Sequence, residues 1–240
     1  MRDFTVSLSL FVLAVGAIGW AQAPFETDTI KTSSGDLQII FIGHATLAFR
    51  YGNLVVYVDP VSQYADFATL VKADIVLVTH EHGDHLDPKA IQATRTEKTV
   101  VVGTAKCTPQ VPGMVTMTNG DSRTVQGLRI EAVPAYNIVN KVFHPRGDGN
   151  GYVITFGDKR VYVAGDTENT AEMKALRNID VAFLPMNLPY TMTPEMVADA
   201  AKAFAPKILY PYHYGSTDTA QLTKLLASVP GIEVRIRNMK

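Results

Sequence analysis

The residues best suited to chemistry are three histidines and one aspartate within a six-residue segment. Side chains two positions apart on an extended chain point the same way, so His80 and His82 can bind one cation together. A turn at Gly83 then directs Asp84 and His85 to a neighbouring position. Imidazole and carboxylate groups suit Zn²⁺, Mn²⁺ or iron, so this order of residues predicts two adjacent metal sites.

A solvated polar loop is the alternative interpretation of this segment. Such a loop has no need for His, His, Asp and His in this order directly after an apolar strand, so metal binding is favoured. Glu81 alternates away from the ligand side chains, and a structural role is favoured for it. Asp87 stands directly before Pro88, a pairing typical of a helix start, so Asp87 is predicted to cap a helix.

Short, β-branched apolar segments surround this motif and predict strands. The predicted strands are residues 37–42, 47–50, 54–58, 75–79, 99–102, 125–133, 151–156, 160–164, 179–184 and 207–212. Capping residues and prolines predict helices at residues 88–95, 170–177, 194–204 and 219–228. The first three strands are expected to form a meander. Strands in each half with helices between them predict an α/β fold, a four-layer α/β/β/α sandwich of two mixed β-sheets.

Length and composition indicate one domain. The 240 residues are 47% hydrophobic, which is enough to build a sizeable core. The formal net charge of −1 provides no basic field of the kind that nucleic acids or anionic lipids require. We therefore expect a small-molecule substrate and no nucleic-acid partner.

The first residues have the pattern of an export signal. Arg2 precedes an apolar run at residues 6–20 that ends in the small-residue pattern Ala21-Gln22-Ala23. A membrane helix needs about 20 apolar residues, and this run is shorter and interrupted, so cleavage is favoured over a permanent anchor. We expect residues 1–23 to be a signal peptide and residues 24–240 to form the mature domain. The mature protein is then periplasmic or secreted, with no stable membrane anchor.

The pattern of His80, His82, Asp84 and His85 resembles the His-x-His-x-Asp-His signature of the metallo-beta-lactamase superfamily. Three other segments resemble motifs of this family and follow in the same order: residues 58–60, 164–167 and 211–215. The resemblance extends over nearly all of the mature chain. It implies the metallo-beta-lactamase fold, hydrolase activity and two zinc ions per chain, with manganese or iron as alternatives.

The resemblance also implies roles for individual residues. Asp59 is expected to brace the metal loop without binding metal, and Asp166 is expected to bridge the two metals. His213 is expected to complete the ligand set. Taken alone, Asp166 would be ambiguous, because a Gly-Asp pair before a turn commonly has a capping role. His213 alone would also be ambiguous. Their positions at strand ends favour convergence with the first motif.

The third motif departs from the family pattern. The family usually has a histidine after the strand that ends near Tyr136, whereas this chain has Asn137. An amide oxygen is a poorer ligand than imidazole, so the first site can be weaker, can use a water, or can recruit His144 from the next loop. A position on a surface loop is the alternative for His144. Asn137 remains a candidate metal ligand, and His144 a candidate catalytic residue.

A binuclear centre implies a mechanism. Two cations about 3.5–4 Å apart can lower the pKa of a shared water and hold hydroxide as the nucleophile, so no serine or cysteine nucleophile is required. By the resemblance, Asp84 binds the second metal and orients this hydroxide. Substrate contacts are expected from His144, Tyr190, Tyr214 and Arg146. Packing is an equally good interpretation for the tyrosines, and a surface role is the commoner one for Arg146.

These features predict an exported hydrolase that uses a metal-bound hydroxide to cleave an ester, a lactone or a phosphodiester. A bridging aspartate at position 166 is similar to the lactonase, phosphodiesterase and thioester hydrolase branches of the family. The segment around His44 resembles the lactonase and phospholipase D branches. Two alternatives remain open: a true metallo-beta-lactamase, and a catalytically degenerate metal-binding module used for recognition. Retention of Asp84, His85, Asp166 and His213 argues against the module.

Overall fold

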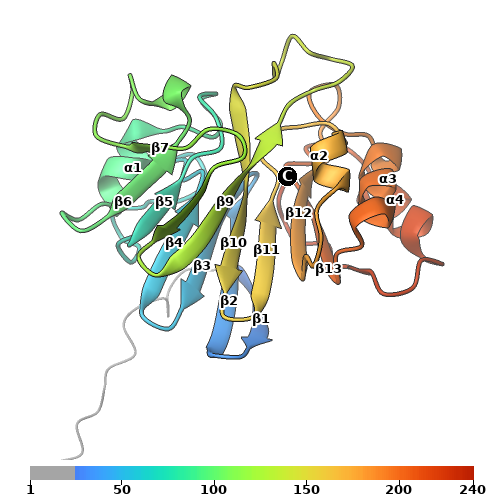
Figure 1. Cartoon of the computed structure of the whole chain (residues 1–240), viewed down its shortest axis with the longest axis horizontal. Coiled ribbons are helices and arrows are strands. Elements are labelled where there is room, and N and C mark those ends of the chain that lie inside the picture. Colours follow the sequence, from blue (N-terminus) through green and yellow to red (C-terminus); the bar gives the residue numbers. More distant parts are fainter. Residues whose placement is uncertain (1–24) are drawn as a thin grey trace, which may run out of the picture.

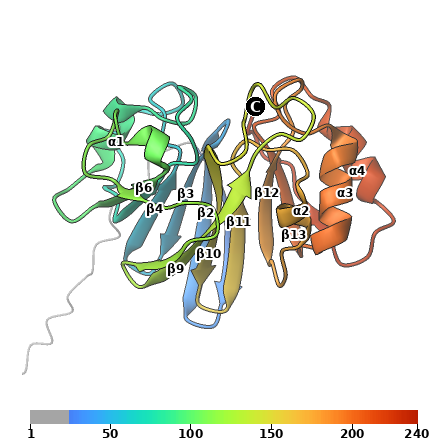
Figure 2. The same cartoon turned by 45° about the horizontal axis from the view of Figure 1, so that its top comes forward.

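The structure, a computed structural model, describes residues 25–240 (Figure 1). Two seven-stranded sheets face each other, and helices lie on the outer side of each sheet, as the views in Figures 1 and 2 show. This arrangement confirms the predicted four-layer α/β/β/α sandwich of two mixed sheets. The predicted signal peptide, residues 1–23, lies outside the described residues.

The first sheet has the strand order β1-β2-β3-β4-β5-β6-β7. Its strands are β1 (Glu26–Thr32), β2 (Gly35–Gly43), β3 (Thr46–Tyr51), β4 (Leu54–Val58), β5 (Ile75–Leu77), β6 (Val100–Gly103) and β7 (Val115–Thr116). Neighbouring strands are antiparallel from β1 to β4 and parallel from β4 to β7. The predicted meander is therefore confirmed, because β2, β3 and β4 pair in succession.

The second sheet has the strand order β14-β13-β12-β11-β10-β9-β8. Its strands are β8 (Ser122–Val125), β9 (Leu128–Ala135), β10 (Gly149–Phe156), β11 (Lys159–Val163), β12 (Val181–Pro185), β13 (Ile208–Tyr212) and β14 (Glu233–Val234). Neighbours are antiparallel from β8 to β11 and parallel from β11 to β14. Both halves of the chain thus build an antiparallel part and a parallel part.

The helices are short and begin at the predicted caps. They are α1 (Pro88–Thr94), a 3-10 helix (Ala105–Cys107), α2 (Ala171–Lys174), α3 (Pro194–Phe204) and α4 (Thr219–Leu226). Asp87 caps α1 by accepting from two backbone N–H groups, and Thr193 caps α3. Helix α2 is shorter than predicted: it ends at Lys174 with Ala175 as its C-cap, and the chain turns at Asn178, which has a left-handed φ of 56°, before β12. In the described part of the chain, no helix has the length and apolar character needed to cross a membrane.

The core explains why the apolar segments show little alternation. On β2, Leu37 and Ile39 belong to the apolar cluster that lies between the sheets. Ile40 and Ile42 point to the opposite face, where a second apolar cluster lies beneath α1. A strand buried on both faces needs apolar residues at nearly every position. The two layers of core therefore anchor the strand ends that carry the site.

Two features of the first and second sheets were not predicted correctly. Strand β1 was missed because it is a polar edge strand, where exposed side chains remove the apolar pattern. The predicted strand at 125–133 contains a turn, since Gln126 and Gly127 take φ values of 47° and 83°. Two consecutive positive φ values are typical of a tight hairpin turn, so β8 ends at Val125 and β9 begins at Leu128.

Candidate metal centre

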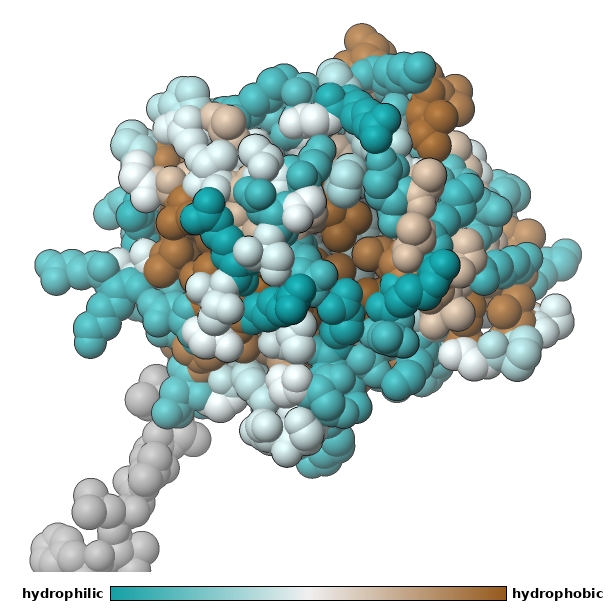
Figure 3. Space-filling view, in the orientation of Figure 1, coloured by the Kyte–Doolittle hydropathy of each residue, from teal (hydrophilic) through white to brown (hydrophobic). Residues whose placement is uncertain are grey.

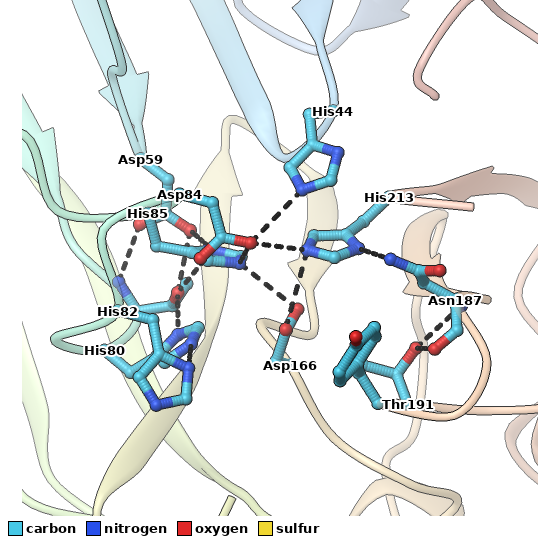
Figure 4. Close-up of polar contacts among 12 residues, drawn as sticks. His44, Asp59, His80, His82, Asp84, His85, Asp166, Asn187, Thr191 and His213 are labelled. Atoms are coloured by element: carbon cyan, nitrogen blue, oxygen red, sulfur yellow. Dashed lines mark hydrogen bonds and ion pairs between the residues drawn. The ribbon is translucent and has the colours of Figure 1, made fainter. Parts of the chain in front are cut away.

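The candidate centre lies where the ends of strands from both sheets meet. His44 follows β2, Asp59 follows β4, and the metal-binding motif follows β5 in the first sheet. Asp166 lies just beyond β11, and His213 directly follows β13 in the second sheet. Figure 4 shows these side chains pointing toward a common centre. All six histidines of the chain belong to groups able to hold a metal ion there.

The first group of donors consists of His80, His82 and His144. One nitrogen from each ring lies within 4.8 Å of the others. His80 Nε2 is 3.1 Å from His82 Nδ1, and His144 Nε2 is 3.3 Å from Asp166 Oδ2. His144 comes from the loop between β9 and β10 and is buried. The structure therefore places the loop histidine at the centre and not on the surface.

The second group gathers around Asp84. Its Oδ2 lies 3.3 Å from His44 Nε2, 3.4 Å from His213 Nε2 and 3.8 Å from His85 Nε2. Figure 4 shows dashed lines from the Asp84 carboxylate to the rings of both His44 and His213. The Asp84 side chain is 46% exposed, whereas His85 is completely buried. The second group is thus accessible to solvent at Asp84, as the first group is at the exposed His82.

Asp166 lies between the two groups. Its Oδ1 is 3.4 Å from His85 Nε2, while its Oδ2 is 3.3 Å from His144 Nε2 and 3.5 Å from His213 Nε2. The preceding Gly165 has a φ of 66°, and a Cβ there would lie 3.0 Å from a side-chain carbon of the neighbouring motif strand. Glycine therefore allows this carboxylate to approach the motif closely.

Asp59 orients the metal-binding motif through hydrogen bonds on the side away from the centre. Its Oδ1 accepts from Thr79 N at 2.8 Å, and its Oδ2 accepts from Thr79 Oγ1 at 2.7 Å and His85 Nδ1 at 2.8 Å. Thr79 Oγ1 is also 3.0 Å from His80 Nδ1. With the Thr79 hydroxyl proton donated to Asp59, its oxygen can accept from His80. One buried carboxylate thus orients His85 directly and His80 through a hydroxyl, leaving both Nε2 atoms directed at the centre.

The charges of the centre are strongly coupled. Burial raises the pKa of Asp166, but His213 and His85 outweigh burial and hold that pKa well below its usual range. Burial also lowers the pKa of His85, yet Asp166 and Asp59 outweigh it and raise the pKa well above the ordinary value. For His80, burial and the neighbouring rings lower the pKa. The buried Asp166 carboxylate therefore stays ionised and requires positive charge at the centre.

The side chains present fit divalent cations. Within residues 25–240, buried polar atoms without a hydrogen-bond partner include His85 Nε2, Asp166 Oδ1 and both ring nitrogens of His144. Leaving such an atom unpaired costs about 1–3 kcal/mol. Imidazole nitrogens and carboxylate oxygens that converge without hydrogen bonds are suitable ligands for zinc and similar ions. We conclude that the donor set suits metal ions better than it suits a dry polar cluster.

Two residues of the centre received no site role from the sequence. His44 Nδ1 lies 3.0 Å from the Lys240 carbonyl oxygen, and the His44 carbonyl accepts from His213 N at 3.0 Å. Asn187 Nδ2 lies 3.3 Å from His213 Nδ1. Both His44 and Asn187 stand just beyond strand ends, of β2 and β12. That position is the signal that could have identified them.

The structure corrects the expected role of Asn137. Its Nδ2 donates to the carbonyl oxygens of Tyr190 at 2.7 Å and Asn140 at 3.2 Å. Its backbone N–H donates to the His144 carbonyl at 2.8 Å. Its buried Oδ1, the atom that would bind a metal, has no hydrogen-bond partner, but Asn137 lines neither cavity of the centre, so it is not placed among the ligands. Instead it joins two loops and supports His144, which occupies the centre.

Two candidates for substrate contact are also corrected. The buried Tyr214 hydroxyl donates to the Arg237 carbonyl at 2.8 Å, so it is engaged by the last residues of the chain. Arg146 Nη2 pairs with Glu172 Oε1 at 2.7 Å, and its guanidinium stacks over Tyr136 at 5.1 Å. Neither side chain lines the cavities at the centre. Tyr214 therefore has a packing role and Arg146 a surface role, which was the alternative for each.

Two adjoining cavities open onto the centre. They have volumes of about 190 and 290 Å³ and share His82, Phe143, His144 and Asp166 in their walls. The larger one also reaches Tyr190, so this tyrosine stands where a substrate contact was predicted. The centre is therefore open to small molecules.

Comparison with known proteins agrees with this arrangement. A family model described as the beta-lactamase superfamily domain matches residues 38–213. The UPF0173 metal-dependent hydrolase of Symbiobacterium thermophilum is 32% identical over 216 residues, covering 84% of this chain and 92% of the relative. The homologue from Methanopyrus kandleri is 31% identical over 195 residues, covering 75% of this chain and 85% of the relative.

A crystal structure shows the same fold at higher identity. The crystallised protein, from Parabacteroides distasonis and assigned as a metal-dependent hydrolase, is 50% identical in sequence to this chain, and the two structures superpose with a TM-score of 0.88. The alignment covers 90% of this chain and 100% of that chain. The matched family region includes every strand end that carries a donor of the centre. This chain therefore belongs to the beta-lactamase superfamily, among its metal-dependent hydrolases of the metallo-beta-lactamase fold.

Proposed function

We propose that this chain hydrolyses an ester, a lactone or a phosphodiester of a small molecule by means of two divalent metal ions, with zinc as the first candidate. The arrangement of two donor groups on either side of Asp166 carries the proposal. A structural zinc ion needs one closed set of four ligands. Here two sets share a carboxylate and open onto a cavity, which is the arrangement of a catalytic centre.

The donors divide into one set for each ion. The first set is His80, His82 and His144, the second is Asp84, His85 and His213, and Asp166 is shared. Two bound cations would supply Lewis acidity and lower the pKa of a water molecule toward neutrality. Asn137 is left out of the set because it lines neither cavity of the centre and its NH₂ group donates to loop carbonyls.

His44 joins the second set. Its Nδ1 lies 3.0 Å from the Lys240 carbonyl, which can accept an N–H from it. Its Nε2 lies 3.3 Å from Asp84 Oδ2, so a cation bound by Asp84 would lie within reach of this nitrogen. A histidine that donates one ring N–H to a backbone carbonyl and directs the other nitrogen at a metal is a common arrangement. His44 therefore completes the second group.

Asp84 is the residue best placed to orient an attacking water molecule. Burial raises its pKa, but contacts with His213 and His44 outweigh burial and hold the pKa well below its usual range. The carboxylate is ionised and half-exposed at the wall of the larger cavity. It can therefore accept a hydrogen bond from an attacking water and orient it. A module used only for recognition would have no need for this exposed carboxylate.

The test measures metal content and turnover on the same samples. We expect about two zinc ions per chain by elemental analysis, and turnover of at least one of four probes: a 4-nitrophenyl ester, a lactone, a phosphodiester or a chromogenic cephalosporin. Asp84→Ala should abolish turnover while the far-ultraviolet circular dichroism stays unchanged. Turnover that survives this substitution refutes the mechanism. Hydrolysis of the cephalosporin alone would assign the chain to the true lactamases, and no bound metal would leave a recognition module.

We further propose that the protein acts outside the cytoplasm. The apolar run that begins after Arg2 and the small residues up to Ala23 support this proposal. Mass spectrometry of the periplasmic and culture fractions of cells that express the full chain should find a protein that begins at residue 24. A full-length chain confined to the cytoplasm would contradict the proposal.

A further inference from the structure

The exposed apolar side chains of this protein gather at the mouth of the metal centre. Within residues 25–240, the large apolar side chains classed as exposed are Ile138, Val139, Val142, Leu188 and Tyr190. All five belong to two loops, between β9 and β10 and between β12 and α3. Figure 3 shows brown surface at the top of the molecule, where Figure 1 places the first of these loops. We name these two loops the apolar rim.

The apolar rim is held in place by buried hydrogen bonds. The buried carboxylate of Glu168 accepts from the backbone N–H groups of Ile138 at 2.7 Å, Val139 at 2.6 Å and Asn140 at 3.1 Å. Asn140 Nδ2 donates to the Pro189 carbonyl at 2.9 Å. Together with the amide of Asn137 described above, this bond connects the two loops. The apolar side chains are therefore presented by a preformed backbone, which lowers the entropy cost of binding.

The inner side of the rim is continuous with the metal centre. The rings of Phe143 and Tyr190 meet edge to face at a centroid distance of 5.0 Å. Both rings line the larger cavity, which has a volume of about 290 Å³. Val142 lines the smaller cavity and is 83% exposed. Small-molecule pockets measure about 300–1,000 Å³, so the space suits one compact group and not a macromolecule.

We propose that the inner side of the apolar rim, formed by Val142, Phe143 and Tyr190, binds an unbranched acyl or alkyl group of the substrate, attached directly to the bond that is cleaved. The proposal rests on the hydrolysis proposed above, since it names part of the molecule that this centre would cleave. The acyl or alkyl chain of a substrate bound at the metal centre would extend outward through the space between Phe143, Val142 and Tyr190. Val142 is 83% exposed and Tyr190 is 46% exposed, so covering them with methylene groups is favourable.

Binding of unbranched carboxylates tests the proposal without requiring turnover. Calorimetry on the zinc-loaded protein with the series from acetate to octanoate should show affinity rising about threefold for each added methylene. Val142→Ser should weaken octanoate binding about fivefold and leave acetate binding unchanged. Val139→Ser is the matched control, because this valine is on the same loop and exposed but lines neither cavity. It should leave the whole series unchanged.

The outcomes separate this proposal from the proposed hydrolysis. If affinity rises with the length of the carboxylate but the protein shows no turnover, the proposal of an apolar site is supported and the proposed hydrolysis is refuted. Turnover with affinity and kcat/KM that do not change with chain length would overturn the apolar site and retain the hydrolase. Equal losses in Val142→Ser and Val139→Ser, together with capture on phosphatidylcholine vesicles, would also overturn the proposal, because the rim would then contact a membrane surface.

Discussion

Replacing Asp59 with asparagine tests whether one buried carboxylate positions ligands of both metal sites. The wild-type carboxylate accepts three hydrogen bonds, two from Thr79 and one from His85 Nδ1. An asparagine side chain has one oxygen and one NH₂ group in the same space. If the NH₂ group faces His85, the ring must accept through Nδ1 and carry its proton on Nε2. The nitrogen that faces the centre then has no lone pair for a metal.

The opposite orientation of the asparagine amide is also unfavourable. Its NH₂ group would then face the Thr79 N–H, so two donors would meet in a site with no access to water. Hydrogen bonds to charged groups contribute about 1.5–3 kcal/mol each, so we expect Asp59→Asn to lower the unfolding free energy of the metal-free protein by about 3 kcal/mol. Loss of support for a ligand weakens metal binding about 10–100-fold. Zinc affinity should therefore fall within this range at both sites.

Zinc titration in competition with a chromophoric chelator measures this loss, and denaturant unfolding of the metal-free protein measures the stability. Asp180→Asn is the matched control. Asp180 is also buried and accepts from Arg160 N at 2.9 Å and Lys207 Nζ at 2.7 Å, but it lies before β12, at the edge of the sheet opposite the centre. Asp180→Asn should lose stability and keep wild-type zinc affinity. Wild-type zinc affinity in Asp59→Asn would refute the proposed role of Asp59.

Three further predictions follow from the structure. His144→Ala should lower bound zinc from about two ions per chain to one by elemental analysis, because it removes a donor of the first group; two retained ions would contradict that assignment. Asn137→Ala should keep both ions but cost about 2 kcal/mol in denaturant unfolding, since the amide donates to the Tyr190 carbonyl and not to a metal; loss of one ion would restore Asn137 as a ligand. Burial raises the pKa of Asp28, but the bond from Arg237 outweighs it and the pKa of the folded protein lies below 3.8. Because a lowered carboxyl pKa stabilises the fold above the pKa of the unfolded chain, Asp28→Asn should cost about 2 kcal/mol at pH 7. The difference between the two unfolding curves should disappear as the pH falls through the pKa of folded Asp28; a difference that persists at lower pH would contradict this reasoning.

Local sequence pattern was sufficient to predict the helices and strands whose ends are marked by capping or turn residues. Asp87 before Pro88 predicted the start of α1, and the structure shows the Asp87 carboxylate accepting from the first free N–H groups. The strand ends before the metal-binding motif were equally clear, because turn residues interrupt apolar segments there. Strand β1 was not predictable in this way, since an edge strand exposes its side chains and shows no apolar pattern.

The residues of the metal centre also divide into those that local sequence pattern predicts and those that it does not. His80, His82, Asp84 and His85 lie close in sequence, so spacing alone determines which side of the chain each side chain faces. Whether His144 or Asn137 reaches the centre depends on the path of a loop between two strands. That path is decided by Glu168, which accepts three backbone N–H groups of the loop from a distant part of the chain. No local pattern encodes such a contact.

His44 shows most clearly what required the tertiary structure. Its position beyond a strand is visible in the sequence, but its role depends on residues far along the chain: the Lys240 carbonyl at Nδ1 and the rings and carboxylate that gather at Nε2. The sequence by itself determined the fold class, the family and the residues of the metal-binding motif, because these follow from short-range spacing and strand polarity. Only the packing of two sheets decided which of the remaining side chains share the centre, since contacts between distant segments form when strand ends of both halves meet at one edge.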